Sequence, residues 1–217
     1  MPDRLDLGSS LPRRSLEAIQ NGTLRYAYKG VPMFKDPFDL ALYQMLLWRL
    51  KPRCLIEIGS KAGGSALWFA DVLAGYGLAA QIHSIDLEPP SLEIPGVVFH
   101  RGDGRRLGET LPDAVMRALP RPLIVVEDAD HHAETTLRVL EFFDAWLAPD
   151  EYVVVEDGIV DDLYDAQRLA QFAGGPRQAV RTFLAARGAD YELDIELCDF
   201  YGKNVTWNVN GYLRRVR

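Results

Sequence analysis

The sequence predicts a single α/β domain whose Rossmann-like, doubly wound sheet is mostly parallel and becomes antiparallel at its C-terminal edge. The first observation is size, because 217 residues, 48% of them hydrophobic, can bury one sizeable core. The second is an alternation of short apolar runs with helical patterns between residues 54 and 156, as in βαβ units. The third is a final stretch, residues 191–215, in which strand-like runs follow one another.

The N-terminal part of the chain divides into an arm and a helix. Residues 1–35 mix charges, Gly and Pro with little periodicity, so we expect an arm or cap there. Asp36 and Pro37 have the character of a helix N-cap and first helical residue, and helical spacing of apolar residues continues to Leu50. The expected domain therefore covers residues 36–217.

The central part of the chain predicts a sheet with helices on both faces. The runs LIVV and YVVV lack polar alternation, as strands buried on both faces should, so they are expected at the sheet centre. The expected strands are CLIEI, QIHSI, VVFH, LIVVE and YVVVE, with helices from about residue 65, near 110–118 and at about 133–147.

The C-terminal part predicts a helix over residues 178–186 and then an antiparallel edge. Its strand-like runs are YELDIELC, NVTWN and GYLRR, with residues 208–211 as a turn. Cys54 and Cys198 fall within strand-like runs, which favours buried core thiols over a disulfide or a metal site.

Composition excludes several classes of partner. A formal charge of −7 opposes binding to nucleic acid, and no apolar run approaches the length of a membrane span. The first residues carry an early acid and then Arg13 and Arg14 without an apolar stretch, so no secretory signal is expected and the cytoplasm is the default. The expected partner is a small molecule, and the N-terminal arm could reach across to a second subunit of a homo-oligomer.

The first strand leads into a glycine-rich loop and then a helix, at the end of the sheet where ligands of such folds bind. The loop fits neither the dinucleotide fingerprint, which needs Gly at Lys61, nor the P-loop. It resembles motif I of class I methyltransferases, which implies S-adenosylmethionine (SAM) as cofactor. A ligand-free turn is the alternative. The candidate cofactor residues of this loop are Glu57, Gly59, Ser60, Gly63, Gly64 and Ser65.

Two further acids complete the expected cofactor site. Asp86 ends the second strand, where a carboxylate can accept hydrogen bonds from both ribose hydroxyls of a nucleoside; the alternative is a solvated turn acid. Asp103 follows VVFH, where methyltransferases of this class line the adenine, although it could equally be a turn residue.

Three carboxylates form a candidate metal site. Asp128 ends LIVVE, and the pair Glu156 and Asp157 ends YVVVE, so neighbouring strands would bring them to one edge of the sheet. Such a group repels itself unless it binds a cation or takes up protons. Oxygen ligands favour Mg²⁺, with Mn²⁺ or Ca²⁺ as substitutes. The alternative is helix capping by Asp128 and Asp130, which does not explain all three acids.

A histidine stands close to this group in the sequence. His131 lies three residues after Asp128 at the expected start of a helix, and His132 follows it. A histidine beside a metal and a cofactor pocket can take the proton from a hydroxyl during methyl transfer. We therefore expect His131, rather than His132, to act as the base, with Asp128 as its catalytic partner at the metal.

Several segments together resemble the cephalosporin hydroxylase family, whose members carry a SAM-dependent methyltransferase fold. They cover most of the chain from Gly30 onward: GVPMFKDPFDLALYQ, IEIGSKAGGSALWFAD, HSID, EDADHH, VVVEDG and CDFYGKNVTWNVNGYLRR. The metal arrangement is also similar to that of catechol and caffeoyl-CoA O-methyltransferases. That likeness implies that Asp128, Glu156 and Asp157 are ligands and that His131 takes the place of the catalytic lysine of those enzymes.

The expected function is Mg²⁺-dependent transfer of the SAM methyl group to a hydroxyl of a sugar, polyketide or catechol-like natural product. Residues 28–35 and the aromatic residues Tyr164, Tyr201 and Trp207 are expected to shape the acceptor pocket. Three alternatives remain: a hydroxylase, a non-catalytic SAM-binding subunit and a metal-independent methyltransferase. An iron hydroxylase would normally need two histidines and one carboxylate at its metal, whereas the ligands expected here are carboxylates.

Overall fold

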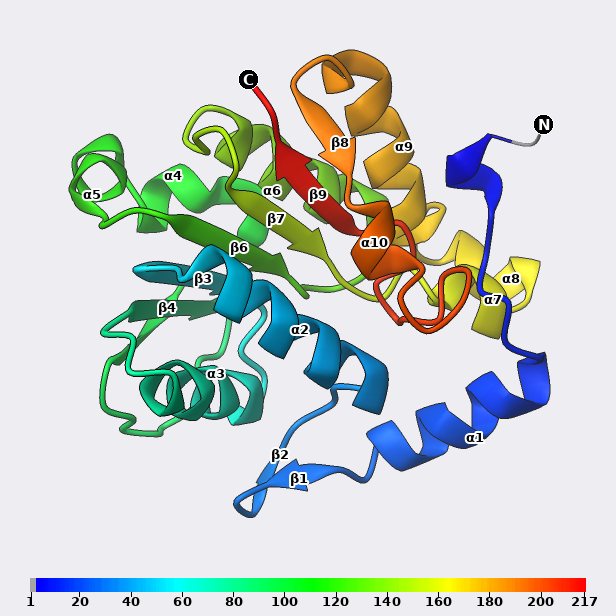
Figure 1. Cartoon of the computed structure of the whole chain (residues 1–217), viewed down its shortest axis with the longest axis horizontal. Coiled ribbons are helices and arrows are strands. Elements are labelled where there is room, and N and C mark those ends of the chain that lie inside the picture. The colour runs from blue at the N-terminus through cyan, green and yellow to red at the C-terminus, as the bar shows by residue number, and fades with distance from the viewer. Residues whose placement is uncertain (1–2) are drawn as a thin grey trace.

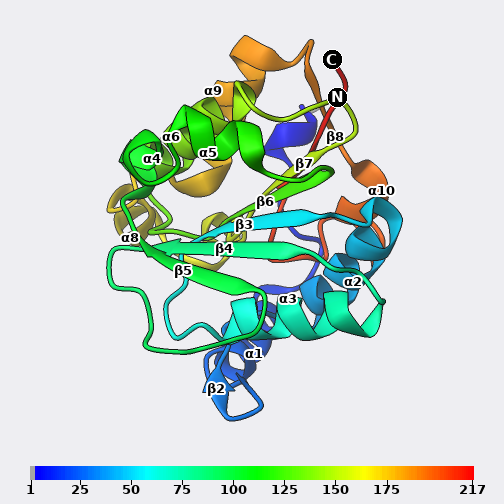
Figure 2. The same cartoon turned by 90° about the vertical axis from the view of Figure 1, so that its left-hand side faces the viewer.

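The computed structural model describes residues 3–217 and has a seven-stranded sheet between two layers of helices (Figures 1 and 2). The strand order is β5-β4-β3-β6-β7-β9-β8. The strands are β3 (Cys54–Ile58), β4 (Gln81–Asp86), β5 (Val97–Arg101), β6 (Leu123–Glu127), β7 (Tyr152–Val155), β8 (Tyr191–Leu193) and β9 (Tyr212–Arg215). A separate antiparallel hairpin joins β1 (Ala27–Tyr28) to β2 (Val31–Pro32).

The five strands β3 to β7 are parallel, and β9 pairs antiparallel with both β7 and β8. The predicted fold class, a doubly wound, mostly parallel sheet with an antiparallel C-terminal edge, is confirmed. The chain runs outward from β3 through β4 to β5 and then returns to the other side of β3 at β6. This reversal of direction places a crevice at the carboxyl ends of β3 and β6, where open α/β sheets bind ligands.

Both faces of the sheet are covered, because successive side chains of a strand point to opposite faces. Leu55 belongs to the core beneath one helix layer, and Ile56 to the core beneath the other. The first layer contains α2 (Pro37–Leu50), α3 (Gly64–Gly75) and α10 (Ile195–Cys198); the second contains α4 (Leu107–Thr110), α5 (Asp113–Ala118), α6 (Ala133–Asp144) and α9 (Gly175–Arg187) (Figure 2).

Helix α2 begins where the sequence predicted. The Asp36 side chain accepts hydrogen bonds from the backbone N–H groups of Phe38, at 2.9 Å, and Asp39, at 3.2 Å. Pro37 occupies the first turn, where its missing N–H costs nothing. This N-cap fixes the direction in which the chain enters α2 and therefore the position of the preceding residues.

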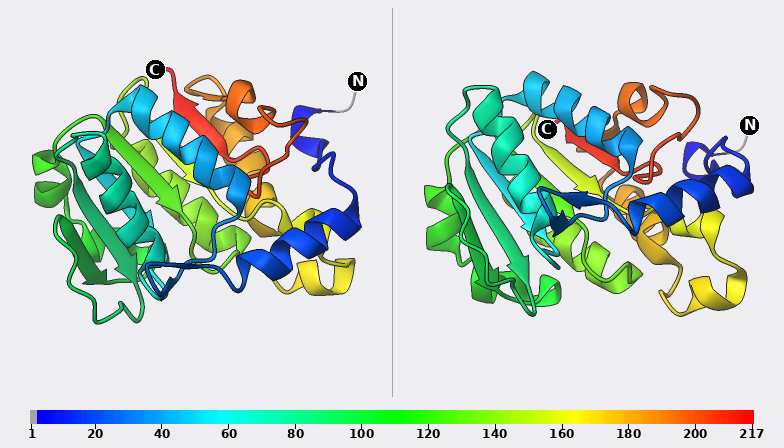
Figure 3. Two further views of the ribbon diagram at one scale, coloured as in Figure 1. Left: turned by 60° about the horizontal axis from the view of Figure 1, so that its bottom comes forward. Right: turned by 90° about the horizontal axis from the view of Figure 1, so that it is seen from below.

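The N-terminal segment is more ordered than the sequence predicted. It contains a short 3₁₀ helix (Arg4–Asp6) and α1 (Arg13–Thr23). Leu16 is buried against Ile159 and Trp207, so a distant part of the chain supplies the apolar surface that stabilises α1. Seen from below, α1 lies beside α7 (Val160–Leu163) and α8 (Ala166–Ala170) near the carboxyl ends of the strands (Figure 3).

Of the three strand-like runs expected near the C-terminus, one is wrong and one is only partly right. YELDIELC forms β8 over its first three residues, and then the Asp194 side chain accepts the Leu197 N–H at 3.1 Å and starts α10. NVTWN is a buried loop, not a strand. GYLRR forms β9 as expected. Both cysteines are buried and free, Cys54 in β3 and Cys198 in the helix α10.

The NVTWN loop is held by a buried carboxylate in place of a strand partner. Asp39, in the first turn of α2, accepts hydrogen bonds from the Thr206 hydroxyl, from the Trp207 backbone N–H at 2.9 Å and from the Tyr212 hydroxyl at 2.8 Å. A buried polar group needs such partners, so α2 and this loop are fastened together. Among residues 3–217, no helix combines the length and the apolar character that crossing a membrane requires.

Candidate active site

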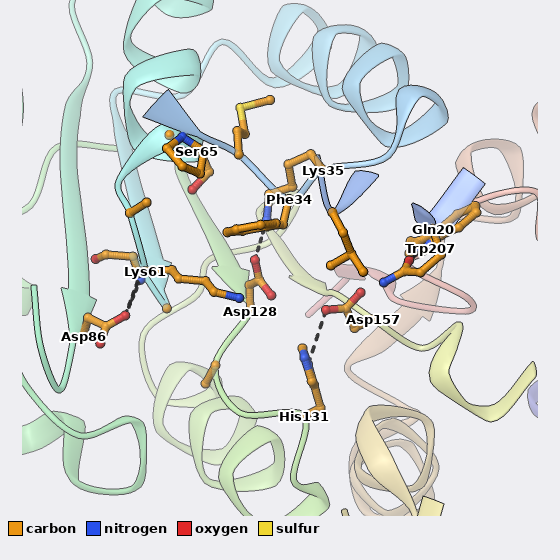
Figure 4. A pocket seen from close by; sticks show the side chains of 18 of the residues that line it. Gln20, Phe34, Lys35, Lys61, Ser65, Asp86, Asp128, His131, Asp157 and Trp207 are labelled. Carbon is orange, nitrogen blue, oxygen red and sulfur yellow. Dashed lines mark hydrogen bonds and ion pairs between the residues drawn. The ribbon is translucent and has the colours of Figure 1, made fainter. Parts of the chain in front are cut away.

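The residues after β3, β6 and β7 meet at one edge of the sheet. Backbone hydrogen bonds continue beyond the strands: the Asp128 N–H donates to the Ile58 carbonyl at 2.8 Å, and the Glu156 N–H donates to the Glu127 carbonyl at 2.9 Å. The glycine loop and the acids of the candidate metal site are therefore neighbours, as the sequence predicted. Figure 4 shows Asp128, His131 and Asp157 facing one another close to Phe34 and Lys35.

Two adjoining cavities, of about 380 and 230 Å³, lie along this edge. Both are lined by Gly59, Asp86 and Ala129, so together they form one elongated cleft. The larger cavity contains the glycine loop and the candidate metal group. The smaller one is lined by Asp103 and its neighbours Gly102 and Gly104.

Asp86 holds the glycine loop in its shape. Its Oδ2 accepts the backbone N–H groups of Ser60 and Lys61, both at 2.8 Å, and its Oδ1 accepts the Glu88 N–H at 2.9 Å. Each carboxylate oxygen can accept more than one hydrogen bond, so this role leaves capacity for a ligand in the adjoining cavity.

Glycine is required at two points of the loop for different reasons. Gly59 has φ +106°, and a Cβ at this position would lie 1.9 Å from the Asp128 carbonyl oxygen. Gly63 has φ +82° and is the N-cap of α3. The loop thus packs directly against the segment that carries Asp128, and its backbone is open to a ligand.

The candidate cofactor residues occupy three kinds of position. Glu57 is fully buried beneath the loop, where its carboxylate accepts the Ser84 hydroxyl at 2.5 Å. Gly63 caps α3 without lining either cavity. The residues that do line the cleft are Gly59, Ser60, Gly64, Ser65, Asp86 and Asp103.

Asp128, His131 and Asp157 converge in the larger cavity. One potential ligand atom from each lies within 4.8 Å of the other two. His131 Nδ1 is 3.3 Å from Asp157 Oδ2. His131 and Asp157 both have positive φ, +59° and +56°, a conformation that costs non-glycine residues energy and that clusters at functional sites.

The pKa of Asp157 is raised. Burial raises the pKa of the Asp157 carboxyl to about 6, the nearby Asp128 adds to the rise, and His131 opposes it. A carboxylate whose charged form is disfavoured in this way gains most from a cation.

Glu156 lies beside this group and is held by other partners. The Tyr43 hydroxyl donates to its Oε1 at 2.6 Å, and the Lys35 ammonium donates to its Oε2 at 2.5 Å. Only 6% of its side chain is exposed. Of the three acids predicted to bind a metal, Asp128 and Asp157 therefore face the cavity, while Glu156 is bonded on both oxygens.

Lys35 is a site residue that the sequence placed only within the broad segment 28–35. Its Nζ also lies 2.6 Å from Asp128 Oδ2, and its side chain is 4% exposed. Burial by itself lowers the pKa of Lys35, but the carboxylates of Asp128 and Glu156 outweigh that effect and raise the pKa well above its ordinary value. Lys35 is thus an ammonium and not a base.

The two histidines that precede α6 have different positions, and so do the two aspartates. His131 lines the larger cavity, whereas His132 is the N-cap residue of α6. Asp130 accepts the His132 N–H at 3.0 Å in the turn before the helix, while the Asp128 carboxylate bonds the Lys35 ammonium. The capping alternative is therefore wrong for both aspartates, because the N-cap residue of α6 is His132 and no side chain caps the helix.

The far wall of the larger cavity comes from segments distant in sequence. Trp207 Nε1 donates to Gln20 Oε1 at 2.6 Å, which ties the buried C-terminal loop to α1. Tyr164 and Trp207 line the cavity as expected. Tyr201 does not line it and instead packs against Phe38, with ring centroids 5.4 Å apart.

Solved structures show which class of protein has this fold. A CmcI complex described with Mg and SAM superposes with a TM-score of 0.67 at 26% identity, covering 97% of this chain and 89% of that one. The apo structure of CalS11, a TDP-rhamnose 3'-O-methyltransferase, has a TM-score of 0.52 at 20% identity over 95% of this chain and 87% of that one, which shows the fold alone. The architecture is that of class I methyltransferases.

Sequence comparison places the chain within one family of that class. The model of the Rhamnosyl O-methyltransferase/CmcI family matches residues 21–96 and 113–216, so the chain belongs to this family. Rhamnosyl O-methyltransferase of Mycobacterium leprae (strain TN) is 28% identical over 195 residues, which cover 87% of this chain and 82% of that protein. The resemblance drawn from the sequence motifs is confirmed.

Proposed function

We propose that this protein is a SAM-dependent O-methyltransferase that uses a divalent cation, Mg²⁺ first, to methylate a sugar hydroxyl of a small molecule. One observation carries the proposal: a cleft that begins at the glycine loop ends at Asp128, His131 and Asp157. Family membership and the rhamnosyl O-methyltransferase relatives support the sugar acceptor.

The glycine loop and its surroundings fit SAM. Gly59 and Gly64 let the loop pack directly against the segments before Lys35 and after β6, because a Cβ on either residue would collide with the carbonyl oxygen of Asp128 or Pro32. The N-terminus of α3 favours the cofactor carboxylate. Asp86 would bind the ribose, and the smaller cavity beside Asp103 would take the adenine.

The acids of the larger cavity fit a hard divalent cation. Asp128 and Asp157 offer carboxylate oxygens at a site where burial, with a smaller contribution from Asp128, raises the pKa of Asp157. Glu156, a third ligand in our proposal, would first have to exchange its bond with Lys35. When bound, the cation supplies a positive charge that orients two neighbouring acceptor oxygens and favours ionisation of one of them.

His131 is the proposed base. Its Nδ1 faces Asp157, which leaves Nε2 as the nitrogen that can take the acceptor's hydroxyl proton. SAM, if held by the glycine loop, would supply the methyl group to the deprotonated oxygen, and S-adenosylhomocysteine would be the second product. Asp157 stabilises the imidazolium that His131 becomes, much as a carboxylate stabilises the base of a hydrolase triad.

Turnover with a panel of rhamnosides and other hydroxylated acceptors tests the proposal. The purified protein is incubated with SAM and Mg²⁺, and the products are weighed by mass spectrometry. We expect S-adenosylhomocysteine and an acceptor that has gained one methyl group. A product that gains an oxygen atom would instead establish the hydroxylase alternative. SAM binding without turnover on any acceptor would favour a non-catalytic subunit.

A further inference from the structure

Lys35 forms an ion-paired group with two acids at the cleft edge. Its Nζ is 2.6 Å from Asp128 Oδ2 and 2.5 Å from Glu156 Oε2, and its side chain is nearly inaccessible to water. Burying an ammonium is costly unless carboxylates compensate it, and both carboxylates here do so at short range. Figure 4 shows Lys35 reaching Asp128 from the segment that precedes α2.

A divalent cation that bridged Asp128 and Glu156 would need the position that the ammonium fills. Mg²⁺ binds oxygens at about 2.0–2.1 Å, so it would approach the same two oxygens more closely than Nζ does. Two positive charges cannot share one such pair of oxygens without strong repulsion. The ammonium and the metal are therefore alternatives.

We propose that Lys35 is an internal cation that occupies the Asp128–Glu156 position in the metal-free protein and competes with the divalent ion for it. The inference rests on the proposed function for its metal, and it assigns Lys35 a positioning role. Lys35 keeps the acids compensated when no metal is bound, and it lowers the affinity of the site for metal by the same contacts.

The backbone on both sides of Lys35 is anchored, so exchange of the ammonium for a metal ion would require only the Lys35 side chain to move. Asp36 is fixed as the N-cap of α2, and on the other side the Met33 N–H donates to the Tyr26 carbonyl at 3.0 Å. Phe34 lines the cleft. When metal binds, the long Lys35 side chain can rotate away while the backbone on both sides stays anchored.

Direct metal titration tests the competition without requiring turnover. Isothermal titration of MgCl₂ and MnCl₂ into the full chain compares wild type with Lys35→Met, which keeps most of the length of the side chain and removes its charge. We expect Lys35→Met to bind metal about 10-fold more tightly or better, because the competing cation is gone. Equal or weaker binding by the folded variant would overturn the proposal.

Lys61→Met is the matched control for charge. Lys61 also lines the cleft, but its ammonium lies over the Phe34 ring, 4.1 Å from the ring centroid. Loss of this charge should change metal affinity by less than about 3-fold. A rise as large as that of Lys35→Met would mean that any positive charge in the cleft has this effect, and the specific competition would be wrong.

A second variant and a stability measurement cover the possibility that Lys35→Met folds poorly. Without metal, Lys35→Met leaves the buried Glu156 carboxylate and the partly exposed Asp128 carboxylate without their ammonium partner. Its melting temperature should therefore fall and then rise more steeply with Mg²⁺ than that of wild type. Adding Glu156→Gln to Lys35→Met should remove most of the gain in metal affinity. If the double variant binds as tightly as Lys35→Met, the metal does not use this position.

The outcomes also separate this inference from the proposed function. Equal metal binding by wild type and Lys35→Met leaves the metal-assisted methyltransferase intact and removes only the role of Lys35. Absence of metal binding from both, with SAM binding retained, would remove the cation from the proposed function and the competition with it.

Discussion

The two halves of the cleft are built in different ways. The half proposed to bind SAM comes mainly from residues 57–104, and Ala129, Asp130 and Thr135 complete its smaller cavity. Its loop is shaped by backbone hydrogen bonds to Asp86 and by glycines. The half proposed to bind metal and acceptor combines α1, the segment before α2, the ends of β6 and β7, and the loop that carries Trp207.

This difference separates a site whose geometry is general to the fold class from a site whose contacts are specific to this chain. A site made mostly by successive strands and the loops that follow them depends on local geometry that any member of the fold class can reproduce. A site made from distant side chains depends on each of several contacts, such as the bond between Gln20 and Trp207. Substitutions in the two halves should therefore fail in different measurements.

The largest effect should follow from Asp128→Ala, in the acceptor half. Loss of a charged group that faces the cation should reduce kcat/KM roughly 1,000-fold, since a bound metal contributes several kcal/mol to such a reaction. Calorimetry should show loss of Mg²⁺ binding while SAM still binds. A loss of SAM affinity as large as the loss in kcat/KM would show that the two halves of the cleft do not act separately.

His131→Ala should come next, with a loss in kcat of about 100-fold, as for removal of a general base. The measurement is kcat across pH, in which the limb that reports the base should disappear. His132→Ala is the matched control, because His132 is the N-cap residue of α6, outside the larger cavity. If the two variants lose activity equally, His131 is not the base.

Asp86→Asn should act on the cofactor half alone. One carboxylate oxygen accepts two backbone N–H groups of the loop, and an amide provides weaker acceptance without charge. We expect SAM affinity to fall about 10-fold, measured by titration, because a hydrogen bond to a charged group contributes roughly 1.5–3 kcal/mol. Mg²⁺ affinity should stay unchanged. A parallel loss of metal binding would contradict the separation of the cofactor half from the metal half.

The smallest effect is expected from Trp207→Phe. It keeps an aromatic ring but removes the donor to Gln20, a bond worth about 1 kcal/mol. The KM for the acceptor should rise about 5-fold at constant SAM affinity, measured by steady-state kinetics. Gln20→Leu should behave in the same way, and additive losses in the double variant would show that the bond itself does not matter.

The strands, the glycine loop and the start of α2 could be predicted from the sequence because their signals are local. The apolar runs, the glycine spacing and the N-cap at Asp36 each follow from properties of neighbouring residues. Asp128 and Asp157 could be expected to meet because parallel strands end at the same edge of a sheet.

The remaining features depend on contacts that local patterns do not contain. Lys35 lies 93 and 121 residues from its two carboxylate partners, and no periodicity indicates such a pairing. NVTWN has the composition of a strand, but the buried carboxylate of Asp39 offers its backbone and Thr206 a different partner. Helix α1 was missed because the surface that buries Leu16 is supplied from elsewhere in the chain.

Helix α1 and the hairpin that follows it form a wall, and the chain continues from this wall into the rest of the fold at α2. This wall lines the larger cavity, on the side proposed for the acceptor, and does not line the smaller cavity proposed for the adenine. Selection can therefore reshape residues 3–31 to admit a different substrate, provided that Pro32 keeps its contact with the glycine loop and Lys35 its contacts with the two acids. Exchange of this segment between relatives, together with the Trp207 loop on which Leu16 rests, is a route to enzymes with new acceptors.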